Sequence, residues 1–345
     1  MVAQGVLILM ATFNGERFIA EQIESIRQQT LPGWRLIVRD DGSSDNTRNI
    51  VRDFSKIDRR VQLVEDEMGR LGPTGNFNRL MEVSCHEYEP YIAFSDQDDV
   101  WEVDKLYHQI QDMMRIEDQF GVESPLLVHS DLRMVNENLV PIHRSFACFQ
   151  HIPHPETHDL HTLMVQNVVV GNTILINKPL LNIAVPIPDA AHMHDWWLAL
   201  CAAVFGTIAY NARQLVQYRI HSHNVTDPIG FWRAVNPMKN AFTERWSKMN
   251  RLFVTSLKQA KALRERIGYH SSSLPQQHRL EEKVNILDDY LAILQLPIYR
   301  RPMHLIKTKI RRQILLLTIF LYLQAVRNDL VGQAAGDIHS MKISA

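Results

Sequence analysis

The chain has 345 residues, 46% hydrophobic and 22% charged, a balance typical of a globular protein with an ample core. A formal net charge of −1 excludes the polycationic character of a nucleic-acid-binding protein. The three cysteines, Cys85, Cys148 and Cys201, are far apart and form no CxxC pair. They favour buried thiols in a reducing compartment over a disulfide framework or a zinc site.

The two most apolar stretches are both too short for a membrane span. The N-terminal stretch VLILMA has no basic region before it, so it predicts a buried strand rather than a signal peptide. The stretch 314–326 is also shorter than the ~20 residues that a transmembrane helix needs. We therefore expect a soluble chain.

Apolar runs alternate with amphipathic stretches along the first hundred residues. Strands are predicted at 6–11, 35–39, 61–65 and 91–95, and helices at 18–29, 46–56 and 76–83. Ser44 or Asp45 would cap the second of these helices. Repeated strand–helix units with continuously apolar strands predict an α/β fold, with a Rossmann-like, mostly parallel sheet flanked by helices. Ligands bind such sheets at the carboxyl ends of the strands, where three polar turns fall here: ATFNGE, RDDGSSD and SDQDD.

The pattern changes along the rest of the chain. A helix at 105–117, strands near 126–130 and 173–177, a helix at 194–204 and strands at 207–211 and 214–220 are predicted. After about residue 230 the sequence becomes rich in Lys, Arg and Leu, with helical periodicity. We therefore expect a domain at 1–230 and an α-helical C-terminal region at 231–345.

Four polar side chains, Asp96 to Asp99, directly follow the apolar run YIAF. They could form a solvated turn in which Asp98 or Asp99 caps a helix beginning near Val103. Alternatively, a hard cation could relieve their repulsion, because Mg²⁺ or Mn²⁺ prefers a few carboxylates together with phosphate oxygens. The D-x-D spacing of Asp96 and Asp98 would let both point to one side and hold a metal ion that carries a diphosphate.

Five motifs occur in an order and spacing that resemble a known family. They are ATFNGE (11–16), VRDDGSSDNT (38–47), FSDQDDVW (94–101), MHDWW (193–197) and YRIHSHNV (218–225). Together they resemble the family 2 glycosyltransferases of the GT-A fold over about two-thirds of the chain. The DQDDVW motif is similar to that of bacterial rhamnosyltransferases that build surface polysaccharides.

The resemblance implies a site for a nucleoside diphosphate sugar. Its first turn would supply Thr12, Phe13, Asn14 and Glu16, and Asn76 would touch the base or the sugar. Asp40 and Asp41 would read the base, which suits uracil or thymine because each presents an N–H donor between two carbonyl groups. Relatives often have Tyr at the position of Phe13, so this chain keeps ring stacking and loses a hydroxyl.

The resemblance also implies a metal ion, Mg²⁺ or Mn²⁺. Asp96 and Asp98 match the metal-binding motif, with contact to the ribose as an alternative for Asp96. His221 matches a C-terminal metal-binding histidine. Arg219 could pair with phosphate oxygens, and a structural salt bridge is the alternative.

Asp195 matches the general base of the family. By local sequence alone it would be the N-cap of an apolar helix with Trp196 and Trp197 in the core. As a base opposite the leaving group it would give in-line displacement with inversion. Relatives commonly have Glu before this Asp, where this chain has His194. Gly171 would be a point of close backbone approach.

We therefore expect an inverting, metal-dependent enzyme that transfers a sugar, L-rhamnose from dTDP-L-rhamnose, to a glycan or lipid-linked glycan during surface polysaccharide assembly. The alternatives are a UDP-hexose or UDP-N-acetylhexosamine transferase and a non-catalytic nucleotide-sugar-binding subunit. The basic cluster at 307–312 and the apolar residues that follow it predict peripheral contact with anionic lipid at the cytoplasmic face of the cell membrane. A homo-oligomer contact would explain the same pattern.

Overall fold

The computed structural model describes residues 5–153, 158–222, 224, 241–270, 277–313 and 315–326. Two compact units are present. The first comprises Met1–His158, Asn167–Ile187 and Met193–Ile220, and the second comprises Asp159–Gln166, Pro188–His192 and His221–Ala345. The domain boundary predicted near residue 230 lies outside the described residues.

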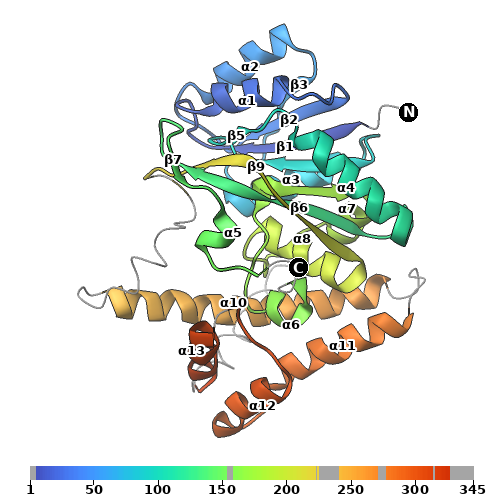
Figure 1. The fold of residues 1–345 in the computed structure, drawn as a ribbon, viewed down its shortest axis with the longest axis vertical. Coiled ribbons are helices and arrows are strands. Elements are labelled where there is room, and N and C mark those ends of the chain that lie inside the picture. Colours follow the sequence, from blue (N-terminus) through green and yellow to red (C-terminus); the bar gives the residue numbers. More distant parts are fainter. Residues whose placement is uncertain are drawn as a thin grey trace. The chain divides into compact units, whose positions relative to one another are not determined.

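The first unit is built on one sheet, with strand order β3-β2-β1-β4-β8-β6-β9-β5 and β7 beside β6 (Figure 1). Its strands are β1 Val6–Thr12, β2 Trp34–Asp40, β3 Val61–Val64, β4 Tyr91–Ser95, β5 Val100–Trp101, β6 Leu126–Val135, β7 Pro141–His143, β8 Ile174–Asn177 and β9 Thr207–Arg219. The first four strands in that order are parallel, as predicted. The α/β prediction is confirmed, although β8 enters antiparallel between β4 and β6 and makes the other half of the sheet mixed.

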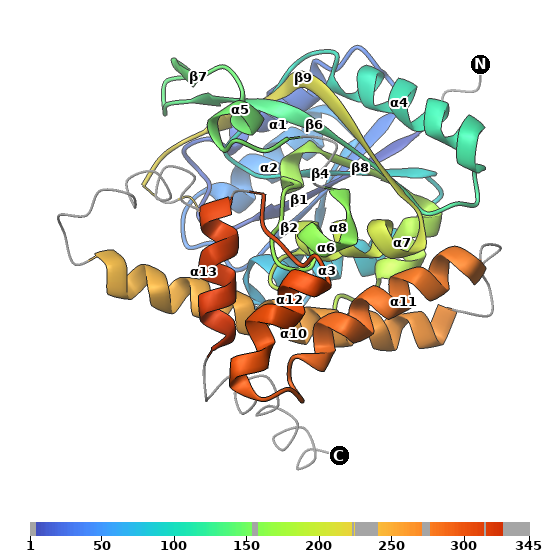
Figure 2. The ribbon, with the colours of Figure 1, turned by 60° about the horizontal axis from the view of Figure 1, so that its bottom comes forward.

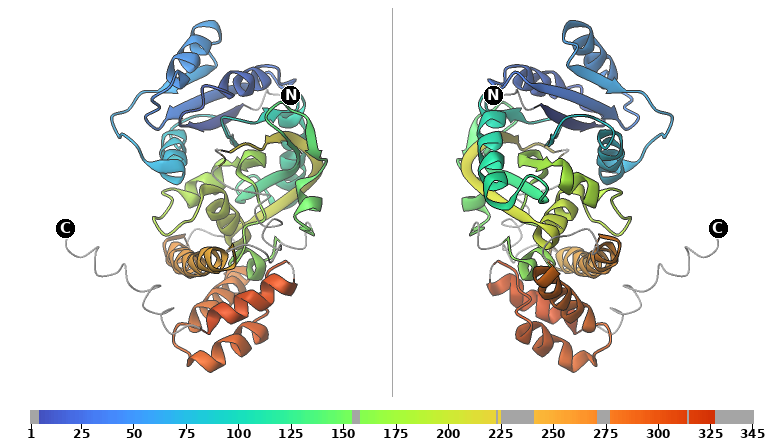
Figure 3. Two further views of the ribbon diagram at one scale, coloured as in Figure 1. Left: turned by 90° about the vertical axis from the view of Figure 1, so that its left-hand side faces the viewer. Right: turned by 90° about the vertical axis from the view of Figure 1, so that its right-hand side faces the viewer.

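Helices pack on both faces of this sheet (Figure 3). Those on one face are α1 Ile19–Arg27, α2 Thr47–Ile57 and α4 Lys105–Phe120; those on the other are α3 Gly72–Ser84, α7 Lys178–Ala184 and α8 His194–Phe205. Strand β4 illustrates the division, because successive side chains of a strand point to opposite faces. Tyr91 donates its hydroxyl to Glu117 of α4, 2.7 Å away, whereas the Phe94 ring lies 5.4 Å from that of His194 in α8.

Three details differ from the sequence predictions. Helix α4 begins at Lys105 with Asp104 at its N-cap, and Asp98 and Asp99 lead instead into the short strand β5, so they do not cap a helix. The N-cap of α2 is Asn46, one residue beyond Asp45. The two predicted strands at 207–220 form the single strand β9, which stays continuous because a register shift against β6 absorbs the polar residues between them.

The second unit is helical, as predicted for the C-terminal region. Its helices are α6 Leu160–Leu163, α10 Ala241–His270, α11 Gln277–Ala292, α12 Arg301–Lys307 and α13 Leu315–Ala325. Helix α10 packs against α11, and α12 against α13 (Figure 2). Within the part of the chain that is described, none of the helices has the length and apolarity to cross a bilayer.

Candidate active site

The polar turns predicted to bind a ligand meet at one edge of the sheet. Thr12, the last residue of β1, is paired with Asp40, the last residue of β2, and Met10 is paired with Ser95 at the end of β4. The carboxyl ends of three parallel strands therefore bring the turns 12–16, 40–46 and 96–99 together, which is where ligands bind in such sheets.

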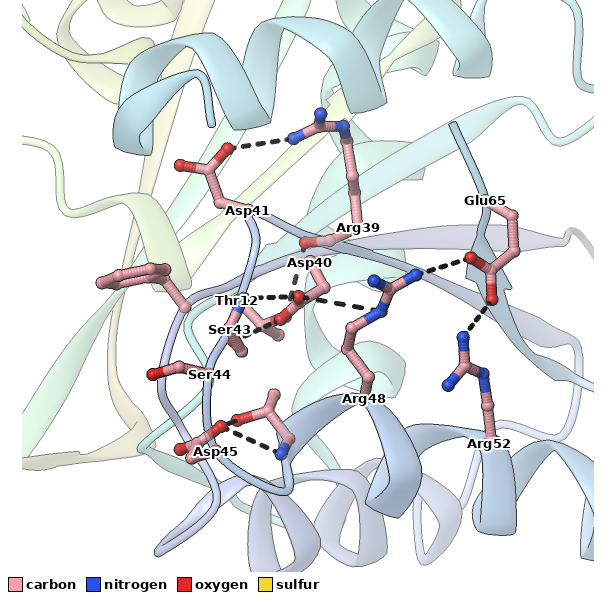
Figure 4. A network of polar contacts seen from close by, with 12 residues as sticks. Thr12, Arg39, Asp40, Asp41, Ser43, Ser44, Asp45, Arg48, Arg52 and Glu65 are labelled. Carbon is pink, nitrogen blue, oxygen red and sulfur yellow. Dashed lines mark hydrogen bonds and ion pairs between the residues drawn. The ribbon is translucent and has the colours of Figure 1, made fainter. Parts of the chain in front are cut away.

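The first two turns are held together by polar contacts (Figure 4). Thr12 Oγ1 donates to Asp40 Oδ2 at 3.0 Å, and Asp40 Oδ1 accepts the Ser43 N–H at 2.8 Å. Asn14, with a positive φ of 48°, accepts the Ser44 N–H on its side-chain oxygen at 2.9 Å. The Glu16 carboxylate accepts the N–H of Asn46 at 2.8 Å. The residues predicted to contact the ligand therefore also bind one another and hold the two turns in place.

The side chains of Asp41 and Asn76 are buried and hydrogen-bonded to other residues of the chain. Asp41 is 3% exposed and accepts the N–H groups of Leu71 and Gly72, at 2.6 and 2.8 Å. The Asn76 side chain accepts from the buried guanidinium of Arg39 at 3.1 Å and donates to the Arg39 carbonyl at 3.2 Å. In the described structure both side chains join the end of β2 to the start of α3.

Phe13 lies between two residues that the sequence analysis did not identify. The guanidinium of Arg70 stacks over the Phe13 ring, 4.0 Å from its centroid, and Arg70 is exposed. The Gln97 amide accepts the Phe13 N–H at 2.9 Å and donates to the Phe13 carbonyl at 3.0 Å. A Cβ on Gly15 would lie only 2.2 Å from Gln97 Oε1, so glycine is needed for this clamp. In the sequence, only Gly15 indicates this contact between Gln97 and Phe13.

The turn 96–99 concentrates negative charge. Burial, the charge of Asp98 and the charge of Asp195 raise the pKa of Asp96 to about 7. Burial and both neighbouring aspartates also raise the pKa of Asp99, which is fully buried and accepts from Asn172 and from the main-chain N–H of Arg219. Asp99 is therefore a structural member of the turn, and Asp96 and Asp98 are the two members that can face a ligand.

Arg219 supplies the cation behind this turn. Its side chain is 2% exposed, and its Nε donates to the Asp98 carbonyl at 2.7 Å. Its terminal nitrogens donate to the Glu137 carbonyl and pair with the Glu21 carboxylate, and the guanidinium lies 4.4 Å from the centroid of Phe18. The contact with Glu21 is the structural salt bridge that the sequence allowed, and the phosphate contact of Arg219 stays a prediction.

Asp195 lies in the first turn of α8, and its charge contributes to the raised pKa of Asp96. Burial raises its pKa to about 6, although the N–H groups of Trp196 and Gly171 and the side chain of Asn167 donate to the carboxylate. Met193 is the N-cap of α8, so Asp195 is not the capping residue. The His194 ring stacks on that of Phe77, with 3.8 Å between the ring centroids. Burial lowers the pKa of His194 to about 3, so the imidazole is neutral at neutral pH. Asp195 lies near the turn 96–99, because Gly171 approaches Asp195 and the next residue, Asn172, donates to Asp99.

His221 belongs to the second unit, where its main-chain N–H donates to Asn224 Oδ1 at 2.6 Å. Among the described residues, no three His, Cys, Asp or Glu side chains are grouped so that they could hold a metal ion. Its neighbour His223 lies outside those residues. The third-ligand role of His221 therefore stays a prediction.

Comparison with known proteins identifies the family. The profile of glycosyl transferase family 2 matches residues 7–123. The chain is 31% identical over 197 residues to Escherichia coli WfgD, named UDP-Glc:alpha-D-GlcNAc-diphosphoundecaprenol beta-1,3-glucosyltransferase, an alignment that covers 56% of this chain and 68% of that protein. The chain belongs to glycosyltransferase family 2.

This family 2 glycosyltransferase is similar to other curated proteins as well. It is 27% identical to the putative teichuronic acid biosynthesis glycosyltransferase TuaG of Bacillus subtilis, over 66% of this chain and 83% of that protein. The dTDP-rhamnosyl transferase RfbG of Shigella flexneri is 40% identical over 103 residues, 29% of this chain and 35% of RfbG.

The GT-A fold of this family 2 glycosyltransferase is confirmed by a solved structure. The structure of S. aureus TarS 1-349 in complex with UDP-GlcNAc matches with a TM-score of 0.50 and 15% identity, over 98% of this chain and 92% of that one. Family membership supports transferase activity, so the chain is an enzyme.

Proposed function

We propose that this glycosyltransferase is an inverting, metal-dependent enzyme whose general base is Asp195. The observation that carries the proposal is that two adjacent residues connect the acidic groups: Gly171 lies against Asp195, and Asn172 donates to Asp99 in the turn 96–99. A sugar held by its diphosphate at the 96–98 turn would then present its anomeric carbon toward Asp195. The chemistry would be an in-line displacement between these two acidic groups.

The residues at 96–98 fit a divalent cation. Asp96 and Asp98 offer oxygen ligands only. Burial and the charge of Asp98 raise the pKa of Asp96, so a cation between the two carboxylates would favour their ionised forms. Mg²⁺ and Mn²⁺ bind to sites with one or two carboxylates when substrate phosphates and water complete the shell. Asp96 and Asp98 would hold the ion, which would stabilise the charge that develops on the leaving diphosphate.

Asp195 would take the proton that the reaction releases. The acceptor hydroxyl oxygen forms a bond to the anomeric carbon as the bond from that carbon to the diphosphate oxygen breaks, and the hydroxyl proton moves to the Asp195 carboxylate. With a pKa of about 6, Asp195 is ionised at neutral pH and close to the value best suited to a base. Attack from the side opposite the leaving group inverts the anomeric centre.

For the donor we propose dTDP-L-rhamnose. The 40% identity to RfbG, named a dTDP-rhamnosyl transferase, supports it. The turns that contain Thr12, Phe13, Asn14, Glu16, Asp40 and Asp41 would bind the thymidine part, with Asn76 holding them from behind. A UDP-hexose or UDP-N-acetylhexosamine donor is the alternative, because WfgD is named as using UDP-Glc and TarS was solved with UDP-GlcNAc.

A panel of nucleotide sugars with Mg²⁺ or Mn²⁺, followed by mass spectrometry of the released nucleotide, tests the donor. We expect dTDP-L-rhamnose to be turned over at least about tenfold faster than UDP-glucose or UDP-GlcNAc, since one good polar contact discriminates by that factor or more. Faster release of UDP than of dTDP would replace the donor with the UDP-linked alternative.

The acceptor we propose is a lipid-linked glycan in bacterial surface polysaccharide assembly, used at the cytoplasmic face of the membrane. WfgD is named for a diphosphoundecaprenol substrate, which supports it. In the second unit α13 exposes Leu315, Ile319 and Leu323, four residues apart, and Lys307, Lys309 and Arg311 before it are exposed cations. An apolar stripe beside cations suits anionic lipid.

Sedimentation with vesicles containing phosphatidylglycerol tests this membrane contact. The full chain should sediment with them, and an Ile319→Asp/Leu323→Asp variant should not. Equal sedimentation of the two proteins would remove the proposal, and a change in their oligomeric state would instead indicate a contact between copies of the chain.

Arg70→Ala is expected to weaken binding of dTDP about 5- to 30-fold with little change in stability. Arg70 is exposed beside Phe13, where the base would stack, so its contact with Phe13 adds little to stability. A bound base would cover the guanidinium, and a desolvated cation–π contact contributes about 1–2 kcal/mol to binding. Calorimetric titration with dTDP gives the affinity. Arg52→Ala is the control, because Arg52 is an arginine of α2 paired with Glu65, and equal affinities for both variants would contradict the role of Arg70.

A further inference from the structure

The segment 167–173 contacts both halves of the proposed reaction centre. Asn172 donates its side-chain N–H to Asp99 in the metal-binding turn. The Thr173 carbonyl accepts from Gln109 Nε2 of α4 at 2.7 Å, and Asn172 and Thr173 are buried. One end of the segment is thus fixed to the turn 96–99 and to a sheet-packed helix.

Gly171 brings the backbone of this segment against Asp195. A Cβ on Gly171 would lie 2.9 Å from His194 Nε2 and 3.6 Å from the Asp195 Cβ. A side chain would therefore force α8 away, and its absence lets the Gly171 N–H donate directly to the Asp195 carboxylate. The close backbone approach expected of this glycine from the sequence is confirmed.

Asn167 uses the two ends of its amide for different contacts. Its Oδ1 accepts the Val169 N–H at 3.0 Å, which shapes the local turn. Its side chain also donates to the Asp195 carboxylate, a contact that only the amide nitrogen can make. With the Trp196 N–H, which reaches Asp195 Oδ1 at 2.6 Å, the carboxylate has donors from three positions of the chain.

We propose that Asn167, together with the Gly171 N–H, positions the Asp195 carboxylate for proton transfer, and that segment 167–173 fixes its place relative to the metal-binding turn. This inference rests on the proposed function of Asp195. Donors from fixed directions set the plane of the carboxylate, and the acceptor hydroxyl would supply a further donor. Hydrogen bonds to the ionised form also keep the carboxylate ready to accept a proton at neutral pH.

Asn167→Asp separates positioning from local structure. Aspartate keeps the oxygen that accepts the Val169 N–H and loses the donor to Asp195. We expect kcat to fall about 10- to 100-fold with unchanged donor affinity, because the loss is confined to the chemical step. The acid limb of the kcat–pH profile should move upward by about one unit, because a donor has been replaced by a second carboxylate.

The matched control is Asn136→Asp. The Asn136 side-chain oxygen also accepts main-chain N–H groups in a turn, from Asn138 at 3.0 Å and Val140 at 2.9 Å. This variant should keep the kcat and the acid limb of the parent enzyme. A parental kcat and acid limb in Asn167→Asp would overturn the proposal.

A readout that needs no turnover separates this inference from the proposed function. The pH dependence with which a carbodiimide labels Asp195, followed by peptide mass spectrometry, should have its midpoint near 6 in the parent and higher in Asn167→Asp. If Asp195→Asn retains transfer, Asp195 is not the base, and the labelling midpoint still measures the Asn167 contact. If Asp195→Asn is inactive and Asn167→Asp shifts neither kcat nor midpoint, only the positioning role fails.

Discussion

Asp195→Asn is expected to lower kcat by about 10³-fold while leaving the affinity for the donor unchanged. An amide of the same shape cannot take the proton that the acceptor hydroxyl must release, and general base catalysis contributes about 10²- to 10⁴-fold. Asp195 is near the turn 96–99 through Gly171 and Asn172, but it lies on α8 rather than on the turn proposed to bind metal and diphosphate. Transfer rates with saturating donor and acceptor give kcat, and calorimetric titration with dTDP gives the affinity.

The control for this prediction is Asp53→Asn, which removes a carboxylate that is 72% exposed on α2 and paired with Lys56. It should retain the kcat of the parent. An Asp195→Asn enzyme with more than about a tenth of parental kcat would mean that another group accepts the proton, since loss of a true base costs more than that. A loss of dTDP binding in the same variant would instead place Asp195 in the donor site.

The parallel half of the fold could be predicted because each of its strands is a continuous apolar run followed by a polar turn. Val6–Thr12 and Tyr91–Ser95 are buried on both faces, and such runs are recognisable in the sequence alone. The antiparallel insertion of β8 between β4 and β6 could not be predicted in the same way. Its four residues, Ile174–Asn177, carry no local mark of direction, which the path of the preceding chain decides.

The site also contains residues that could be predicted from local sequence and residues that could not. Asp96, Asp98 and Asp195 are recognisable because their motifs are local and acidic. Gln97 and Asn167 act through contacts with residues distant in the chain: Gln97 binds Phe13, 84 positions away, and Asn167 binds Asp195. The sequence around a neutral amide side chain does not indicate which distant residue that side chain binds. Glycines at 15 and 171, where no Cβ fits, are the sequence features that mark both contacts.

Arg219 holds the acidic turn at 96–99 from one side. Behind the turn, Arg219 is bound to the Asp98 carbonyl and its own N–H to the Asp99 carboxylate. In front, the Asp96 carboxylate carries a raised pKa. Arg219 therefore holds the turn through the Asp98 carbonyl and its own N–H, while its charge is paired with Glu21. A cation bound in front would relieve the repulsion between Asp96 and Asp98.

Arg219→Met is expected to lower the free energy of unfolding by about 2–4 kcal/mol, because the buried guanidinium is lost and two partly buried carbonyl groups and the Glu21 carboxylate lose their charged donor. Binding of Mn²⁺ with dTDP should weaken as well, since the turn that holds Asp98 loses its support. Urea unfolding and calorimetric titration measure the two effects.

Arg17→Met is the matched control for this buried arginine. Arg17 also pairs with Glu137, through a side chain that is 60% exposed, so its loss should cost less than about 0.5 kcal/mol. Arg219→Lys should fall between the two variants, because an ammonium keeps the charge but cannot reach Asp98, Glu137 and Glu21 together. Equal unfolding free energies for Arg219→Met and Arg17→Met would mean that the turn 96–99 is held by other contacts and that Arg219 does not stabilise it.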